Sequence, residues 1–237
     1  MTQATLQIEN VNAYYDELRI NHGATMMLDS GATSVIGRNG MGKTTLMKAI
    51  MGLVRREGSI RLFGEELVGL KPYEIARRGI GYVPQGRRNF PSLTVEEHLT
   101  FCATKGFGNE RNLWDKNRVY ELFPRLYERR TQFGTSLSGG EQQMLAIGRA
   151  LVLNPKLLIL DEPSEGLAPT IVDQLAVCLN SLKAQEIGIL LVEQDLDFCE
   201  QVTDRTNIMS NGEIVYTGSL KEIRGNKEMS QRLLGVS

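Results

Sequence analysis

Short apolar runs alternate with stretches of helical periodicity along much of this chain. Four runs rich in Val, Ile and Leu are typical of buried strands; they are Thr33 to Ile36, Ile80 to Val83, Leu157 to Leu160 and Ile189 to Val192. Helical patterns lie at Lys43 to Met51, Gly140 to Leu153, Thr170 to Leu182 and Leu196 to Val202. Strands that alternate with helices predict an α/β core with a mainly parallel sheet.

Other segments predict additions to this core. "LQIENVNAYY" and "GSIRLFG" are typical of more exposed antiparallel strands, and "NIMSNGEIVYTG" predicts a hairpin that turns at Asn211 and Gly212. The strand pattern disappears between Pro91 and Gly134, where helical patterns dominate. We therefore expect a single domain. Its parts are a core with a β subdomain (1–90 and 155–218), an inserted helical subdomain (91–154) and a tail of two short helices (219–237).

Composition narrows the class of protein. The net charge is −1 and no long basic run occurs, which disfavours non-specific binding of nucleic acid. The three cysteines are scattered and show no paired spacing, which is typical of reduced thiols in the cytosol and disfavours a disulfide scaffold or a zinc site. The N-terminus has no apolar signal region, and no segment approaches the ~20 apolar residues of a membrane span. We expect a soluble protein that is able to dock on a membrane protein.

The segment "TSLSGGEQQMLAIGRAL" (135–151) predicts a buried helix with an unusual beginning. Ser138 and Glu141 have the spacing of a capping box. Gly139 and Gly140 are poor residues for a first helical turn, since each costs up to ~1 kcal/mol relative to Ala. Two interpretations stay open: an ordinary capped helix that tolerates the glycines, or a helix N-terminus that an anion such as phosphate approaches closely.

A phosphate-binding loop is predicted at "GRNGMGKTT", which fits the pattern G-x-x-x-x-G-K-[ST] between a strand and a helix. Its glycines let the backbone fold N–H groups around a β-phosphate. Lys43 is expected to bridge the β- and γ-phosphates, and the Thr44 hydroxyl to bind Mg²⁺. The full set of expected ATP-binding residues in this loop is Gly37, Arg38, Asn39, Gly40, Met41, Gly42, Lys43, Thr44 and Thr45.

A second acidic motif follows a buried strand in "LLILDEP" (157–163). Open α/β sheets bind ligands at the carboxyl ends of their strands, where Asp161 and Glu162 are predicted to lie. Asp161 is expected to hold Mg²⁺ through its water shell. Glu162 is in position to polarise an attacking water molecule as a general base.

With a phosphate loop, "LSGGEQQ" and "LLILDEP" in this order, the whole chain resembles the ATP-binding subunits of ABC transporters. The resemblance implies the ABC ATPase fold, which is a P-loop NTPase core with an antiparallel β subdomain and an inserted helical subdomain. It also implies a head-to-tail pair of ATPase subunits, in which the signature helix of one chain faces the γ-phosphate held by the partner's Lys43. The residues expected to face that second ATP are Ser138, Gly139, Gly140 and Glu141.

The resemblance assigns further roles residue by residue. Gln85 matches the glutamine that reaches Mg²⁺ and the γ-phosphate, and Tyr15, in preference to Tyr14, matches the aromatic residue that stacks on adenine. Gln194 stands where the family usually has a histidine. Glutamine donates a hydrogen bond to phosphate but never becomes cationic, so catalysis is expected to rest more heavily on Glu162.

The motifs "VPQGRRNFPSLTVEEHL", "SEGLAP" and "LLVEQ" together resemble the subgroup that powers importers of branched-chain amino acids. That implies two polytopic membrane permease subunits, a second ATPase subunit that is identical or related, and indirectly a solute-binding protein. It places the chain on the cytoplasmic face of a bacterial or archaeal membrane. Importers of urea or short amides remain an alternative. An ATPase acting on nucleic acid or ribosomes is disfavoured, because the chain has one cassette and no sustained heptads or cysteine pairs.

Overall fold

Two sheets organise the structure, a computed structural model that describes residues 5–103 and 114–234. The larger sheet has six strands in the order β10-β9-β3-β8-β7-β6. Its strands are β3 (Ala32–Ile36), β6 (Ile80–Val83), β7 (Leu157–Asp161), β8 (Gly188–Glu193), β9 (Arg205–Ser210) and β10 (Glu213–Gly218). All neighbouring pairs are parallel except β9 and β10. The predicted α/β core and its four buried strands are therefore confirmed.

The hairpin at the sheet edge also matches the prediction. β9 and β10 pair antiparallel around Asn211 and Gly212, whose φ angles are 48° and 80°. Both residues lie in the left-handed region that a two-residue type I′ turn requires.

A second, antiparallel sheet has the order β2-β1-β4-β5. Its strands are β1 (Leu6–Tyr15), β2 (Leu18–Leu28), β4 (Arg55–Leu62) and β5 (Glu65–Glu66). β1 and β4 contain the predicted exposed strands. β2 was not predicted, because polar residues and a glycine interrupt the apolar alternation of "LRINHGATMML".

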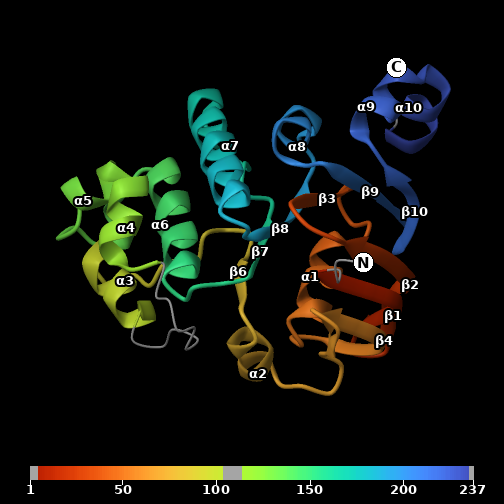
Figure 1. Cartoon of the computed structure of the whole chain (residues 1–237), viewed down its shortest axis with the longest axis horizontal. Helices are drawn as coiled ribbons and strands as arrows, with labels where there is room; N and C mark the ends of the chain where they lie inside the picture. The colour runs from red at the N-terminus through yellow and green to blue at the C-terminus, as the bar shows by residue number, and fades with distance from the viewer. Residues whose placement is uncertain (1–4, 104–113, 235–237) are drawn as a thin grey trace.

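The helices lie in three places along the molecule (Figure 1). α3 (Val95–Ala103), α4 (Lys116–Leu122), α5 (Pro124–Glu128) and α6 (Gly139–Leu151) gather at one end, with the short 3₁₀ turn Gly134–Ser136 before α6. α1 (Lys43–Ile50), α2 (Pro72–Arg77), α7 (Pro169–Ala184) and α8 (Leu196–Val202) accompany the sheets. α9 (Leu220–Gly225) and α10 (Lys227–Leu234) follow β10 at the other end.

These helices confirm the predicted helical patterns, and α9 and α10 are the two short helices expected in the tail. Residues 104–113 of the predicted helical subdomain and 235–237 of the tail lie outside the described residues. α2 was not predicted, because six residues are too few to show a helical period. In the part of the chain that the structure describes, none of the helices has the length and apolar character needed to cross a membrane.

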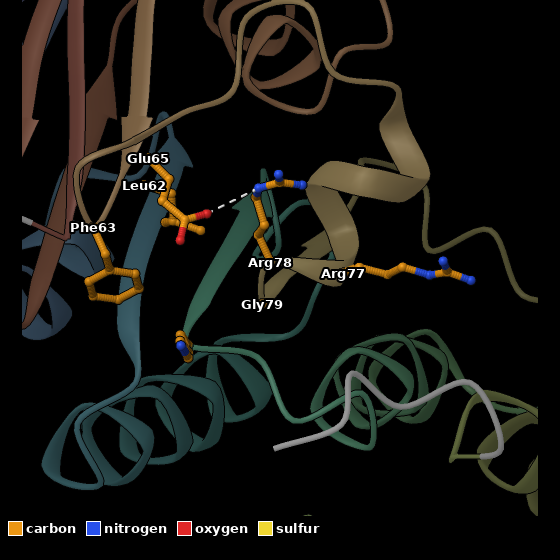
Figure 2. Close-up of a pocket in the computed structure, with 7 residues that line it drawn as sticks. Leu62, Phe63, Glu65, Arg77, Arg78 and Gly79 are labelled. Carbon is orange, nitrogen blue, oxygen red and sulfur yellow. Dashed lines mark hydrogen bonds and ion pairs between the residues drawn. The ribbon is translucent and has the colours of Figure 1, made fainter. Parts of the chain in front are cut away.

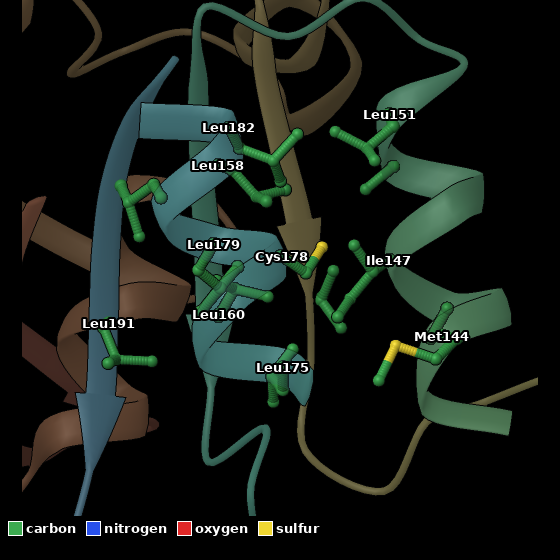
Figure 3. Close-up of a cluster of buried hydrophobic side chains, with 14 of the residues drawn as sticks. Met144, Ile147, Leu151, Leu158, Leu160, Leu175, Cys178, Leu179, Leu182 and Leu191 are labelled. Carbon is green, nitrogen blue, oxygen red and sulfur yellow. The ribbon is translucent and has the colours of Figure 1, made fainter. Parts of the chain in front are cut away.

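The central strand β7 shows how the core holds the site in place. Leu158 and Leu160 pack on one face of the sheet with α6 and α7 (Figure 3), whereas Leu157 and Ile159 belong to the apolar cluster with α1 and β1 on the other face. All four side chains are fully buried, and each such leucine or isoleucine contributes about 1.5–3 kcal/mol to stability. The carboxyl end of β7, which leads into Glu162, is thus anchored from both sides.

Candidate nucleotide-binding site

The phosphate loop joins β3 to α1 and leaves the beginning of the helix open. Gly40 and Gly42 have φ angles of 80° and 99°, which glycine adopts readily and other residues rarely. No side chain caps α1, and its first turn contains no acidic residue. The N-terminal N–H groups of a helix suit an anion when no side chain occupies them. The loop therefore has the backbone and charge that a phosphate group requires.

The rest of the loop is fastened to the β9–β10 hairpin. The carbonyl of Met41 accepts a hydrogen bond from the Gly212 N–H at 3.0 Å, and its sulfur accepts one from the Asn211 N–H at 3.3 Å. A Cβ atom at Gly37 would collide with the carbonyl of Met209, so only glycine fits there. Arg38 and Asn39 continue the loop, and Thr45 is buried in α1.

Lys43 begins α1 and directs its amine back into the loop. The Nζ atom donates to the carbonyl of Gly37 at 2.7 Å and to that of Arg38 at 3.3 Å. It also lies 3.4 Å from Oε1 of Glu162, and the lysine side chain is 4% exposed. A buried cation of this kind needs an anionic partner, and an enzyme can exchange a carboxylate for a phosphate.

The carboxylate of Glu162 is contacted by three other predicted site residues. Besides Lys43, its oxygens accept hydrogen bonds from Nε2 of Gln194 at 2.9 Å and from Nε2 of Gln85 at 3.1 Å. Its backbone is left-handed, with a φ of 49°, and its N–H donates to the carbonyl of Val192 at 2.9 Å. The three side chains predicted to contact the γ-phosphate thus converge on one anionic group, and the same donors suit phosphate oxygens.

Asp161 ends β7 beside the phosphate loop. The Thr44 hydroxyl donates to Oδ1 at 3.0 Å, and the Tyr82 hydroxyl donates to Oδ2 at 3.2 Å. Burial raises the pKa of Asp161 and that of Tyr82. The described residues contain no cluster of three or more His, Cys, Asp or Glu side chains that could hold a metal. One carboxylate and one hydroxyl fit Mg²⁺, which in nucleotide sites takes its other ligands from phosphate and water.

Two residues of the site were missed by the sequence analysis. Tyr82 positions Asp161, and no motif marks it apart from its place on a buried strand. Glu193 ends β8 and is buried, which raises its pKa. Its carboxylate accepts hydrogen bonds from the N–H of Ser164 at 2.9 Å and of Gln194 at 3.0 Å. The sequence did contain a signal for Glu193: it directly follows the buried strand "ILLV", just as Asp161 directly follows "LLIL".

The signature helix α6 has the predicted capping box. The Ser138 hydroxyl accepts from the Glu141 N–H at 3.3 Å, and the Glu141 carboxylate accepts from the Ser138 N–H at 2.8 Å. Both glycines of the first turn also have close neighbours within this chain. A Cβ at Gly140 would lie 2.9 Å from Cγ2 of Ile171, and one at Gly139 would lie 3.0 Å from Nη1 of Arg87.

Tyr15 and Tyr14 lie in different surroundings at the end of β1. The Tyr15 hydroxyl accepts a hydrogen bond from Nζ of Lys48, on α1, at 2.6 Å, and its ring is 41% exposed. Tyr14 instead donates to Glu57 at 2.8 Å and lies under the guanidinium of Arg55. Of the two rings, Tyr15 is the one placed beside the phosphate-loop helix.

Apart from Tyr15, which contacts Lys48, and the backbone of the phosphate loop, the predicted site residues form two groups. Direct contacts unite one of them: Lys43, Thr44, Gln85, Asp161, Glu162 and Gln194. The second group, Ser138 to Glu141, lies at the beginning of α6, and within the described residues no hydrogen bond or ion pair joins it to the first.

A small cavity of about 190 Å³ lies elsewhere (Figure 2). Residues of the β4–β5 turn, the end of α2 and the starts of β6 and β7 line it; they are Leu62, Phe63, Glu65, Arg77, Arg78, Gly79 and Lys156. It thus lies at the amino ends of β6 and β7, whereas Asp161 and Glu162 lie at the carboxyl end of β7. None of the lining residues belongs to the predicted phosphate site, so this cavity is separate from it.

The comparisons with known proteins agree with this geometry. Residues 22–165 match the protein family described as ABC transporter. The chain belongs to this family, and within it to the ATP-binding cassettes, the ATPase subunits of the transporters.

Individual relatives match from end to end. The high-affinity branched-chain amino acid transport ATP-binding protein BraG of Pseudomonas aeruginosa is 42% identical over 97% of this chain and 99% of its own. The probable branched-chain amino acid transport ATP-binding protein LivF of Archaeoglobus fulgidus is 32% identical over 98% and 99%. The solved structure of MJ1267, an ATP-binding cassette of an ABC transporter, superposes with a TM-score of 0.85 at 25% identity and covers 100% of both chains.

Proposed function

We propose that this chain is the ATP-hydrolysing subunit of an importer for branched-chain or other hydrophobic amino acids. The observation that carries the proposal is the similarity to BraG, which is 42% identical over 97% of this chain. The convergence of Lys43, Gln85 and Gln194 on Glu162 supports hydrolysis as its chemistry.

The phosphate loop and Asp161 hold the nucleotide in this proposal. Lys43 binds the β- and γ-phosphates, while Thr44 and Asp161, with Gln85, hold Mg²⁺. When bound, Mg²⁺ neutralises charge on the phosphate oxygens. Tyr15 supports the adenine ring, to which its exposed face is accessible.

Glu162 acts as the general base. The amides of Gln85 and Gln194 each donate to one of its two oxygens, which orients the carboxylate. The carboxylate accepts the proton of a water molecule aligned with the γ-phosphate. Gln194 donates hydrogen bonds to phosphate oxygens, but its neutral amide is a negligible base, so the basicity of the site comes from Glu162.

Two copies of this chain, or this chain and a related ATPase, close on two ATP molecules. Ser138 to Glu141 of each face the γ-phosphate held by the other. The helical subdomain (91–154), with the segment after Gln85, contacts two membrane permeases on the cytoplasmic face of the membrane. Exposed aromatic rings there, Phe90 and Phe133, support this contact surface. A solute-binding protein joins the complex indirectly, and nucleic acid has no part in it.

Co-purification from the source cell, followed by uptake measurements in vesicles, tests the proposal. We expect two polytopic membrane proteins to accompany the chain, and ATP to drive uptake of labelled leucine that unlabelled isoleucine inhibits and urea does not. Inhibition by urea alone would contradict the cargo, and recovery of nucleic acid or ribosomes would contradict the function.

Gln85→Ala tests how the ATP site communicates with the permeases. Because Gln85 connects Glu162 to the segment that enters the helical subdomain, its loss should reduce uptake more than tenfold and change ATP affinity only about twofold. Equal losses of uptake and ATP affinity would remove the coupling role.

A further inference from the structure

Arg87 has no role in the function proposed so far, yet its backbone is unusual. Gly86, Arg87 and Arg88 have φ angles of 82°, 63° and 43°, so three consecutive residues are left-handed. Only glycine adopts this conformation without cost, and an arginine in it requires contacts that hold it there.

One side of the Arg87 guanidinium contacts the loop that follows Glu162. Its Nη2 atom donates to the carbonyl of Glu165 at 3.2 Å, and a Cβ atom at Gly166 would lie 3.9 Å from the same nitrogen. The neighbouring Gln85 donates to the Glu165 carboxylate at 2.9 Å. The segment after β6 is therefore attached to the loop 164–169, "SEGLAP".

The other side of the guanidinium lies against the first turn of α6. A Cβ atom at Gly139 would be 3.0 Å from Nη1 and 3.4 Å from Cζ of Arg87, which is closer than ordinary contact. The half-buried guanidinium thus occupies the space that a side chain at position 139 would need. A planar guanidinium can contact two surfaces at once, which the single amine of lysine does less well.

From this geometry we infer that Arg87 is a positioning residue that fixes the first turn of the signature helix to the loop 164–169. In this arrangement position 139 requires glycine, because a side chain there would occupy the space of the Arg87 guanidinium. The inference rests on the proposed function for its consequence: both segments are presented to the second ATPase subunit, and Arg87 keeps them in one relative position.

Hydrogen exchange on the nucleotide-free full chain tests the contact itself. The reporters are the Leu167 N–H, which donates to Ser164, and the Gln142 N–H, which donates to Ser138. Arg87→Ala should speed exchange of both about tenfold. Arg88→Ala, an exposed neighbour with the same charge and backbone, is the matched control and should change neither. Equal behaviour of the two variants would overturn the inference.

Three further variants test whether the two contacts of the Arg87 guanidinium depend on each other. Gly139→Ala should displace the guanidinium and therefore speed exchange at Leu167, on a different segment. The double variant should be no faster at Leu167 than Arg87→Ala alone, and Arg87→Lys should recover less than half of the lost protection. An unchanged Leu167 in Gly139→Ala, or full recovery with lysine, would contradict the two-sided contact.

The consequence is measured as ATP-driven association in a Glu162→Gln background, which prevents turnover. Arg87→Ala should raise the Kd for pairing of the subunits about tenfold and leave the Kd for ATP in the single chain unchanged, a split that loss of folding would not produce. Unchanged pairing would overturn the positioning role. If the Glu162→Gln chain with native Arg87 fails to associate at all, the proposed function fails, and the exchange data still decide the role of Arg87.

Discussion

Helices α1 and α6 both begin in glycine-rich motifs, but their N-termini are chemically different. α1 follows Gly42 with no capping side chain and no acid in its first turn. α6 begins with a complete capping box, in which Ser138 and Glu141 satisfy each other's N–H groups. Because a carboxylate already lies at the beginning of α6, less of its positive end remains for another anion. The α1 terminus is therefore open to a phosphate within one chain, whereas in the proposed function α6 contributes to a site that a second subunit completes.

The glycines of the two motifs also have different physical causes. Gly40 and Gly42 are needed for their left-handed backbone. Gly139 and Gly140 lie in the first turn of a regular helix, where Arg87 and Ile171 leave little room for a side chain. Glycine therefore meets a conformational requirement in the phosphate loop and a packing requirement in the first turn of α6.

Lys43→Ala breaks the α1 side of the comparison and has the largest expected effect. It removes the buried charge that spans the phosphates, so ATP hydrolysis should fall to background and nucleotide binding should weaken. The rate of phosphate release measures hydrolysis, and titration with nucleotide measures binding. Lys48→Ala, in the last turn of the same helix, should stay within about threefold of the native rate, because it removes only an exposed hydrogen bond to Tyr15, worth about 0.5–1.5 kcal/mol. Near-native turnover by Lys43→Ala would remove the phosphate-loop assignment.

Glu162→Gln tests the chemistry next to the α1 site. It retains hydrogen bonding and deletes basicity, so kcat should fall at least ~10²-fold while ATP binding and a long-lived pair of subunits persist. Gln194→Ala removes one contact to the same carboxylate and should slow hydrolysis less. Both variants are compared by ATPase rate and by the lifetime of the pair. A lower ATPase rate in Gln194→Ala than in Glu162→Gln would show that Glu162 is not the main catalytic residue.

Ser138→Arg breaks the α6 side alone. A bulky cation at the beginning of the helix should abolish ATP-driven pairing and leave the affinity of the single chain for ATP within about twofold, because α1 and α6 of one chain belong to different half-sites in the proposed function. Gel filtration with ATP separates the two outcomes. An undiminished pair would return this segment to the role of an ordinary capped helix.

Ser138→Ala tests the difference in capping between α1 and α6, and it has the smallest expected effect of these variants. Loss of an N-cap should lower the free energy of unfolding by about 1 kcal/mol, measured in urea. The α1 terminus has no capping side chain to lose, so its helix depends on packing. No change in stability would mean that the Ser138–Glu141 pair contributes nothing to α6.

Much of this molecule follows from local sequence. The phosphate loop, the buried strands and the Asn211–Gly212 turn depend on backbone preferences and on apolar runs that need no distant partner. Asp161 and Glu162 were predicted because a buried strand delivers its last residues to the edge of the sheet. The capping box of α6 was equally local, since its two residues are three positions apart. These features are encoded within a few residues, so the sequence by itself determined them.

Only the tertiary structure decided which groups meet. Glu162 is held by donors from α1, from the segment after β6 and from the segment after β8, and no spacing along the chain predicts those three contacts. The strand β2 was missed because its pairing with β1, rather than its own composition, makes it a strand. The contact between Gly139 and Arg87 does not follow from "LSGGEQQ", because it depends on where the segment after β6 places the guanidinium. Long-range contacts set these features, since burial and hydrogen bonding depend on neighbours in space.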